Sequence, residues 1–161
     1  MSELRIEKHR AAAEVTLATG AAVRGCFFLA GSSAAHAGPE RVGDLLNAEK
    51  GFFPFDLACP GPDGPTTVLY NRAQLVLVRL IDHTTEAQLD PGYDSATKRH
   101  VSVLLSNGST VSGVVRVYRP AGRDRLSDYA RSSDAFRYIE GTSATYIVNV
   151  SHVVELREIA E

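Results

Sequence analysis

Short apolar runs separated by glycine-containing turns dominate the pattern of hydrophobic and polar positions along the chain. Strands are expected near 13–18 and 22–30, on either side of one such turn, and again near 101–106 and 110–119. Apolar runs of this length bounded by turn residues predict strands, and glycine suits the positive φ of a tight turn. The pattern therefore predicts two β-hairpins of similar design.

A helical segment and three further strands are expected after each hairpin. Residues 41–49 carry apolar positions at spacings of three and four, which predict a short helix, and residues 125–131 are expected to form a turn or helix. The remaining strands are expected near 52–57, 66–69, 75–81, 135–140, 144–149 and 152–158. Five short antiparallel strands per half favour closure, because closure removes exposed strand edges. We therefore expect a mainly β chain of two tandem five-stranded small barrels, each with a short helix.

Three sequence blocks recur in the same order in the two parts of the chain, which indicates an internal duplication. We divide the chain accordingly into a first barrel at residues 1–81, a linker at 82–100 and a second barrel at 101–161. The linker is expected to be exposed, and residues 30–40 are interpreted as a flexible insertion because most of them have no counterpart in the second barrel. The corresponding positions of the two barrels are Gly25 and Gly113, Asp44 and Asp128, and Asn71 and Asn149.

The strand at 75–81 is more apolar than its counterpart at 152–158, so we expect it to be buried on both faces against the second barrel. Residues 1–10 are polar and are expected to be weakly ordered. Residues 52–55 and 75–78 hold more apolar surface than one small barrel buries. This surplus predicts a homodimer or a larger homo-oligomer.

Composition and charge restrict the function classes. Hydrophobic residues make up 44% of the 161 positions, which is enough for a core, and the formal net charge is −2. Basic and acidic residues are balanced in both barrels, which argues against bulk affinity for nucleic acid. Charges spread through the first 30 residues fit neither a signal peptide nor a membrane span, so we expect a cytoplasmic protein without membrane association.

No motif for a metal, a cofactor or catalysis is present. Cys26 and Cys59 do not form a CxxC pair, and the five histidines have no ligand-like spacing, so no metal site is expected. Cys26 is expected to pack as a small apolar group. No glycine-rich loop precedes a helix and no triad is suggested, so we expect no cofactor and no enzymatic activity.

Arginine and aromatic residues are concentrated between positions 116 and 138. Exposed side chains of these types anchor protein partners or stack on nucleic-acid bases, whereas the same composition also suits a solvated hairpin with core tyrosines. The sequence leaves these interpretations open. The candidate contact residues are Arg116, Tyr118, Arg119, Arg123, Arg125, Arg131 and Arg137.

The repeated polar positions also have two interpretations. Asp44 follows Arg41, and Asp128 follows Arg125, at the same spacing. Each aspartate either belongs to a duplicated polar site or caps a short helix and pairs with its arginine, and capping explains the residue choice without a ligand. The repeated asparagines are expected in bends, where Asn bonds locally and tolerates left-handed geometry. The repeated glycines are expected to give room in a bent strand.

The opening hairpins, from Val15 to Gly25 and from Val103 to Gly113, and the closing segment 68–76 resemble the Sm-like (SH3-type) small-barrel superfamily. Residues 41–55 and 71–72 are also similar to a pattern of uncharacterised bacterial proteins, Arg-x-x-Asp-x-x-Asn followed by aromatic-x-Pro and Asn-Arg. The resemblance implies a small-barrel fold for both parts. It does not imply the RNA pocket of the superfamily, because Asp44-Leu-Leu-Asn47 departs from the spacing of its RNA-binding signature.

These observations together predict a non-enzymatic protein-interaction or scaffold module whose protein partner the sequence does not identify. The alternative is nucleic-acid binding, with RNA as the ligand, through the stretch 116–138.

Overall fold

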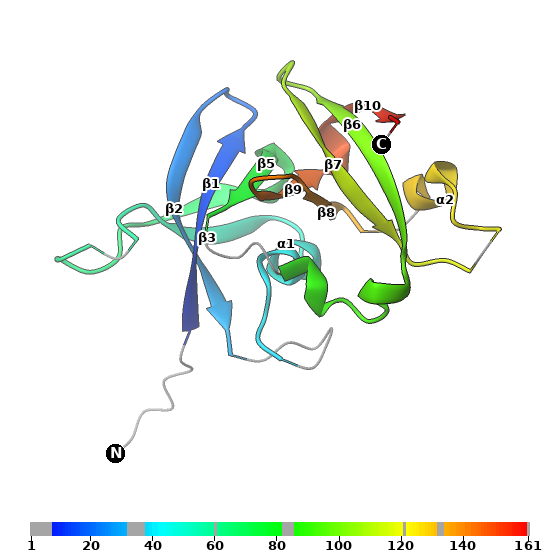
Figure 1. Cartoon of the computed structure of the whole chain (residues 1–161). Coiled ribbons are helices and arrows are strands. Elements are labelled where there is room, and N and C mark those ends of the chain that lie inside the picture. The colour runs from blue at the N-terminus through cyan, green and yellow to red at the C-terminus, as the bar shows by residue number, and fades with distance from the viewer. Residues whose placement is uncertain are drawn as a thin grey trace.

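The computed structural model describes residues 8–31, 38–59, 61–81, 86–120, 122–131 and 134–160 of a mainly β chain (Figure 1). The first half comprises β1 (Lys8–Leu17), β2 (Ala22–Ala30), α1 (Val42–Ala48), β3 (Phe52–Asp56), β4 (Thr67–Asn71), the 3₁₀ turn η1 (Arg72–Gln74) and β5 (Leu75–Leu80). A connecting segment carries the 3₁₀ turns η2 (Glu86–Leu89) and η3 (Tyr93–Ser95). The second half comprises β6 (Thr97–Leu105), β7 (Thr110–Val117), α2 (Leu126–Ala130), β8 (Phe136–Glu140), β9 (Thr145–Asn149), η4 (Val150–His152) and β10 (Val153–Glu158).

The ten strands of the described residues belong to one antiparallel sheet, in the order β10-β6-β7-β8-β9-β5-β1-β2-β3-β4. In each half the first strand pairs with the second and the fifth, and the third strand lies between the second and the fourth. The pairing of β5 with β9, in which Leu77 lies opposite Val148, joins the halves. The mainly β class is confirmed. The two separately closed barrels that we expected are not formed by this pairing, because the sheet is continuous and β10 and β4 remain at its two ends.

Two strands begin earlier than the apolar pattern predicted. β1 begins at Lys8, which pairs with Ala30, and β6 begins at Thr97, which pairs with Val117. A partner strand thus orders polar residues that alone would not predict a strand. The expected exposure of the linker is also wrong for η2, where the side chains of Glu86 and Ala87 are buried. Residues 82–85 of the linker and 32–37 of the expected insertion lie outside the described residues.

Two hydrophobic clusters form the core, and both contain residues of both halves. The first is built mainly from β1, β2, α1, β3 and β5 and includes Phe136 and Ile147 of the second half. Its centre is a group of aromatic rings. The centroid of the Phe27 ring lies 5.5 Å from that of Phe53 and 5.2 Å from that of Phe55. Edge-on and offset contacts at these distances stabilise aromatic pairs beyond the area that they bury.

The second cluster lies under β6 and β7 and includes Val76 of β5. Leu75, Val78 and Leu80 of the same strand belong to the first cluster. The prediction that this strand is buried on both faces against the second half is therefore confirmed. β5 is thus a strand that contributes buried side chains to both clusters.

Gly25 in β2 and Gly113 in β7 occupy matching close contacts between strands. A Cβ atom at Gly25 would lie 2.3 Å from the backbone oxygen of Asp56, and one at Gly113 would lie 2.5 Å from that of Glu140. Only glycine fits at such distances. The sequence interpretation of both glycines as positions that give room in a bent strand is confirmed.

Cys26 in β2 and Cys59, after β3, form a disulfide with a Cα–Cα distance of 5.1 Å. This distance lies within the range usual for disulfides. Cys26 is buried in the sheet as expected, but its bond to Cys59 was not predicted from the sequence. None of the helices in the described part of the chain has the length and apolar character needed to span a bilayer.

Candidate functional site

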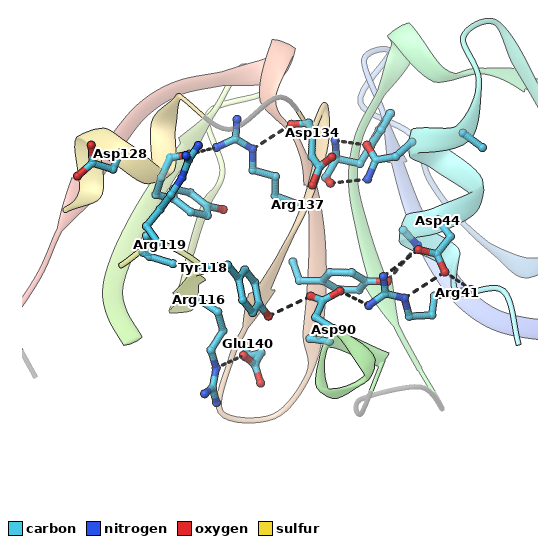
Figure 2. A pocket seen from close by; sticks show the side chains of 18 of the residues that line it. Arg41, Asp44, Asp90, Arg116, Tyr118, Arg119, Asp128, Asp134, Arg137 and Glu140 are labelled. Atoms are coloured by element: carbon cyan, nitrogen blue, oxygen red, sulfur yellow. Dashed lines mark hydrogen bonds and ion pairs between the residues drawn. The ribbon is translucent and has the colours of Figure 1, made fainter. Parts of the chain in front are cut away.

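A pocket of about 740 Å³ opens where the two halves meet (Figure 2). Side chains from α1, the connecting segment, β7, α2 and β8 line it. Much of the lining is charged or aromatic, and the candidate residues Arg116, Tyr118, Arg119 and Arg137 belong to it. Whether these side chains are available to a ligand depends on the partners that each already has within the chain.

Arg41, immediately before α1, has its guanidinium fully engaged. It donates to Asp44 from Nε at 3.1 Å and from Nη2 at 2.8 Å, and to Asp90 Oδ1 from Nη1 at 2.5 Å. Asp44 Oδ2 also accepts from the backbone N–H of Arg41 at 2.9 Å. Burial lowers the pKa of Arg41, but hydrogen bonds and charges of Asp44, Tyr138 and Asp90 outweigh it and raise the pKa overall. Asp44 thus caps α1 and pairs with its arginine, as expected.

Glu86 of η2 connects the two halves through a buried carboxylate. Its oxygens accept from the backbone N–H of Val42 at 3.1 Å and from the Tyr138 hydroxyl at 2.8 Å. The same hydroxyl accepts from the N–H of Gly43 at 3.1 Å. Burial and the charge of Glu86 raise the pKa of Tyr138, so the hydroxyl keeps the proton that it donates. This arrangement fixes α1 against β8.

Arg116 and Tyr118 hold the other end of the connecting segment. Arg116 donates to Glu140 Oε2 at 3.0 Å and to the Tyr93 hydroxyl at 2.7 Å, and its guanidinium lies 3.8 Å from the centroid of the Tyr93 ring. The Tyr118 hydroxyl donates to Asp90 Oδ2 at 3.0 Å. These two candidate contact residues are therefore used inside the chain.

Arg137 also has an internal role. Its guanidinium donates to the backbone oxygens of Tyr129 at 2.6 Å and Asp134 at 2.9 Å, and it lies 4.9 Å from the centroid of the Tyr129 ring. The carbonyl groups at the end of α2 gain a charged donor in this way. Arg137 thus ties α2 to β8 rather than facing a partner.

Four other candidate arginines, Arg119, Arg123, Arg125 and Arg131, are exposed and have no such side-chain partners among the described residues. Arg119, Arg123 and Arg131 line a smaller concavity of about 280 Å³ together with Asp128. Within the described residues none of these three guanidinium groups forms an ion pair or a hydrogen bond. We call the concavity that Arg119, Arg123 and Arg131 line the arginine concavity.

Asp128 matches Asp44 only in part. Its Oδ2 accepts from the backbone N–H of Arg125 at 3.1 Å, which is the same capping contact. The expected ion pair between Asp128 and the Arg125 side chain is not formed among the described residues. The described part of the second half therefore has the cap without the carboxylate cluster that surrounds Arg41.

The repeated asparagines have equivalent positions. Asn71 Oδ1 accepts from Ala73 N, and Asn149 Oδ1 accepts from Ser151 N, each at 3.0 Å. Both residues have φ near −80°, so the local bonding is confirmed while the left-handed geometry is not used. Asn149 Nδ2 also donates to the Leu75 carbonyl at 2.8 Å, across the junction of the halves.

A serine–histidine pair lies outside both pockets. Ser106 Oγ is 2.8 Å from His152 Nδ1, and His152 Nε2 is 2.7 Å from the Ala73 carbonyl oxygen. Because a carbonyl only accepts, Nε2 carries the proton and Nδ1 accepts from the serine hydroxyl. The third partner is a backbone carbonyl rather than a carboxylate, and neither side chain lines a described pocket. His152 thus connects η4 both to the turn after β6, through Ser106, and to η1, through Ala73.

The sequence did not predict the part that the connecting segment plays: Asp90 lines the large pocket, and Glu86 and Tyr93 hold the segment against the two halves. The acidic residues of the connecting segment had the composition of a solvated linker, and no spacing rule relates them to Arg41. In the described parts of the chain, no group of three or more His, Cys, Asp or Glu side chains is arranged to hold a metal ion. No known protein family, curated protein or solved structure matches this chain.

Proposed function

We propose that this protein is a non-enzymatic interaction module that joins copies of itself head to tail through the open ends of its sheet. The observation that carries the proposal is the position of the exposed apolar side chains. Leu69 in β4 is 64% exposed, Phe52 beside it in β3 is 62% exposed, and Val154 in β10 is 65% exposed. No other described large hydrophobic residue is as exposed. Leu69 and Val154 lie in β4 and β10, the two end strands of the sheet, and Phe52 lies in β3, which pairs with β4.

The pairing between the halves gives the geometry of such a contact. β9, the fourth strand of the second half, pairs with β5, the fifth strand of the first. The free strands β4 and β10 are the fourth strand of the first half and the fifth of the second. A second copy can therefore place its β10 beside β4 and repeat a strand pairing that the chain already makes. Unpaired edge strands with apolar side chains are prone to pair in this way.

The test compares charged variants at the two ends. Leu69→Lys and Val154→Lys each place a charge on one edge, and Ser112→Lys places the same charge on β7, which is paired on both sides. Light scattering at micromolar concentration should give a mass above the 17.3 kDa of one chain for the parent and for Ser112→Lys. Each edge variant alone should be a monomer. The parent assembly should survive high salt, because apolar contacts are not screened.

Mixing the two edge variants identifies the orientation. Each variant keeps one intact edge, so a head-to-tail contact predicts a one-to-one complex in the mixture. An association of β4 with β4 predicts instead that Val154→Lys dimerises alone and that mixing restores nothing. A parent chain that is monomeric in low and high salt would overturn the proposal.

Nucleic-acid binding through residues 116–138 is the second candidate. The observation in its favour is that Arg119, Arg123 and Arg131 are exposed and unpaired. Binding of single-stranded RNA at two salt concentrations tests it, because a complex based on phosphate contacts weakens steeply with salt. Binding that does not respond to salt, or that survives replacement of these arginines, would contradict it.

We also propose that the two halves arose by duplication of one Sm-like unit. The proposal is supported by the same succession of five strands and one helix in each half and by the matched contacts of Gly25 and Gly113. The cytoplasmic location stays a prediction. The disulfide between Cys26 and Cys59 weighs against a strongly reducing compartment, where disulfides are rare.

A further inference from the structure

The surroundings of Asp128, which lies in the arginine concavity, differ from those of Asp44 because no acidic side chain of the connecting segment pairs with the arginines there in the described part of the chain. In the first half, the connecting segment supplies Glu86 and Asp90 to the start of α1, and Asp90 pairs with Arg41 at 2.5 Å. The capping contact of Asp44 recurs at Asp128, at nearly the same distance. The arginines near Asp128 nevertheless have no carboxylate partner from elsewhere in the described chain.

Three guanidinium groups around one carboxylate leave the arginine concavity with an excess of positive charge, although the whole chain has a formal net charge of −2. Like charges held close together repel one another, and a ligand that carries negative charge relieves this repulsion. Guanidinium groups bind carboxylates through paired N–H donors, which makes the contact directional as well as attractive.

We propose that the arginine concavity binds an acidic peptide segment of a partner protein, whose carboxylates pair with Arg119, Arg123 and Arg131 as Asp44 and Asp90 pair with Arg41. The proposal extends the interaction role to a second surface, separate from the ends of the sheet. Its basis is the connecting segment in the first half, where Asp90 pairs with Arg41 of the Arg-x-x-Asp sequence and Glu86, four residues earlier, accepts from the backbone N–H of Val42.

A peptide suits this surface better than a nucleic-acid strand. Asp128 lies in the concavity, and Asp134 lines the adjoining pocket. A strand with a charge on every nucleotide would place phosphates against these carboxylates, whereas a peptide can present its acidic side chains only opposite the arginines. The negative net charge of the chain also gives no long-range attraction for a polyanion.

The experiment uses the full chain and a fluorescent peptide with the sequence of residues 86–95, followed by anisotropy at low salt. The tethered copy of this segment already occupies the first half, so added peptide reports on the second. A control peptide carries the replacements Glu86→Gln, Asp90→Asn and Asp94→Asn. The parent chain should bind the acidic peptide at least tenfold more tightly than the control peptide.

Two protein variants test the location. Arg119→Ser/Arg123→Ser/Arg131→Ser removes the proposed site, and Arg24→Ser/Lys98→Ser/Arg157→Ser removes the same charge from exposed positions elsewhere. The first variant should bind the acidic peptide at least tenfold more weakly than the parent, and the second within about twofold of it. No measurable binding to the parent, equal weakening in both variants, or single-stranded RNA that binds this site more tightly than the peptide would overturn the proposal.

Self-association is measured on the same samples. The arginine variant should keep the mass of the parent assembly, and Leu69→Lys should keep peptide binding. A parent chain that self-associates without binding the peptide would contradict only the peptide site. A parent chain that binds the peptide as a monomer would contradict only the head-to-tail contact.

Discussion

At the scale of single residues, the structure depends on a few positions where a side chain of one size or charge fits. Gly25 and Gly113 permit close strand crossings. Asp56 is a buried carboxylate that accepts from the backbone N–H groups of Ala58 at 3.0 Å and Thr66 at 2.9 Å and pairs with Arg10. Each of these positions leads to a test of stability rather than of activity.

Replacing either glycine by alanine should lower the free energy of unfolding. The added Cβ would meet a backbone oxygen that cannot move without its strand, and overpacking of this kind costs about 1–3 kcal/mol. Urea unfolding of Gly25→Ala and Gly113→Ala measures the effect, with Ser112→Val on the exposed face of β7 as the control. Unfolding midpoints for both glycine variants equal to that of the parent would show that the crossings are not tight.

Asp56 should make stability depend on pH. Desolvation raises its pKa, but the N–H groups of Thr66, Ala58 and Cys59 and the charge of Arg10 outweigh this and lower the pKa below its usual value. A lowered pKa means that the ionised carboxylate stabilises the fold above about pH 4, and that this contribution disappears as the pH falls through the folded-state pKa.

The measurement compares the parent with Asp56→Asn at pH 7 and pH 3. The variant should be less stable at pH 7, and the difference from the parent should shrink at pH 3. Asp63→Asn, at an exposed turn, serves as the control and should match the parent at both values. A difference that stays constant with pH would show that packing of the side chain, and not its charge, is what matters.

At the scale of elements, the connecting segment acts as a clamp between the halves. η2 contacts the start of α1 through Glu86, and η3 contacts β7 and β8 through Tyr93. These contacts come from short 3₁₀ turns that have little stability of their own. The position of α1 against β8 therefore depends on side chains of a segment that the sequence presented as a linker.

Glu86→Ala should free this segment. The change leaves the Tyr138 hydroxyl and the Val42 N–H without their acceptor, and loss of such a buried partner costs about 1–3 kcal/mol. Limited proteolysis, followed by mass spectrometry, should show cleavage within residues 86–96 roughly tenfold faster or more than in the parent. Glu155→Ala, on the exposed strand β10, should be cut like the parent. Equal cleavage in all three chains would mean that Glu86 does not hold the segment.

At the scale of the whole molecule, the two halves share their interior. Phe136 and Ile147 belong to the core of the first half, and Val76 belongs to the core of the second. The pairing of β5 with β9 adds backbone hydrogen bonds to the same junction. Neither half has a complete core without the other.

The chain should therefore unfold in one cooperative transition. Calorimetry of the parent should give a calorimetric enthalpy equal to the van't Hoff enthalpy, as expected for a two-state domain. Weakening the junction with Ile147→Ala should shift the whole transition to lower temperature, and Ser112→Val should not shift it. Two resolved transitions in the parent would show that the halves are independent units.

The local pattern of the sequence was sufficient to predict most elements but not their assembly. Alternation and turn residues identify the hairpins because these contacts are local. The joining of β5 to β9 could not be predicted, because a pairing between distant strands leaves no local signal beyond the high apolar content of 75–81. The early starts of β1 and β6 were missed because the order of their polar residues comes from the partner strands.

The sequence predicted the arginine and aromatic residues of the candidate site, but it did not predict what each of these residues does. Residues of the stretch 116–138 do line the pockets. Arg116 and Arg137 serve the fold, whereas Arg119, Arg123, Arg125 and Arg131 have no side-chain partner among the described residues. The sequence alone does not distinguish an arginine that pairs within the fold from one that is exposed to solvent, because both kinds have similar neighbours along the chain.

The disulfide between Cys26 and Cys59 has a consequence for how damage to the chain would be detected. The bond closes a covalent ring that contains the end of β2, all of α1 and all of β3. A single protease cut anywhere between the two cysteines opens the ring without releasing a fragment. The nicked protein would migrate with the intact chain on a denaturing gel run without reductant, and it would separate into two pieces only after reduction.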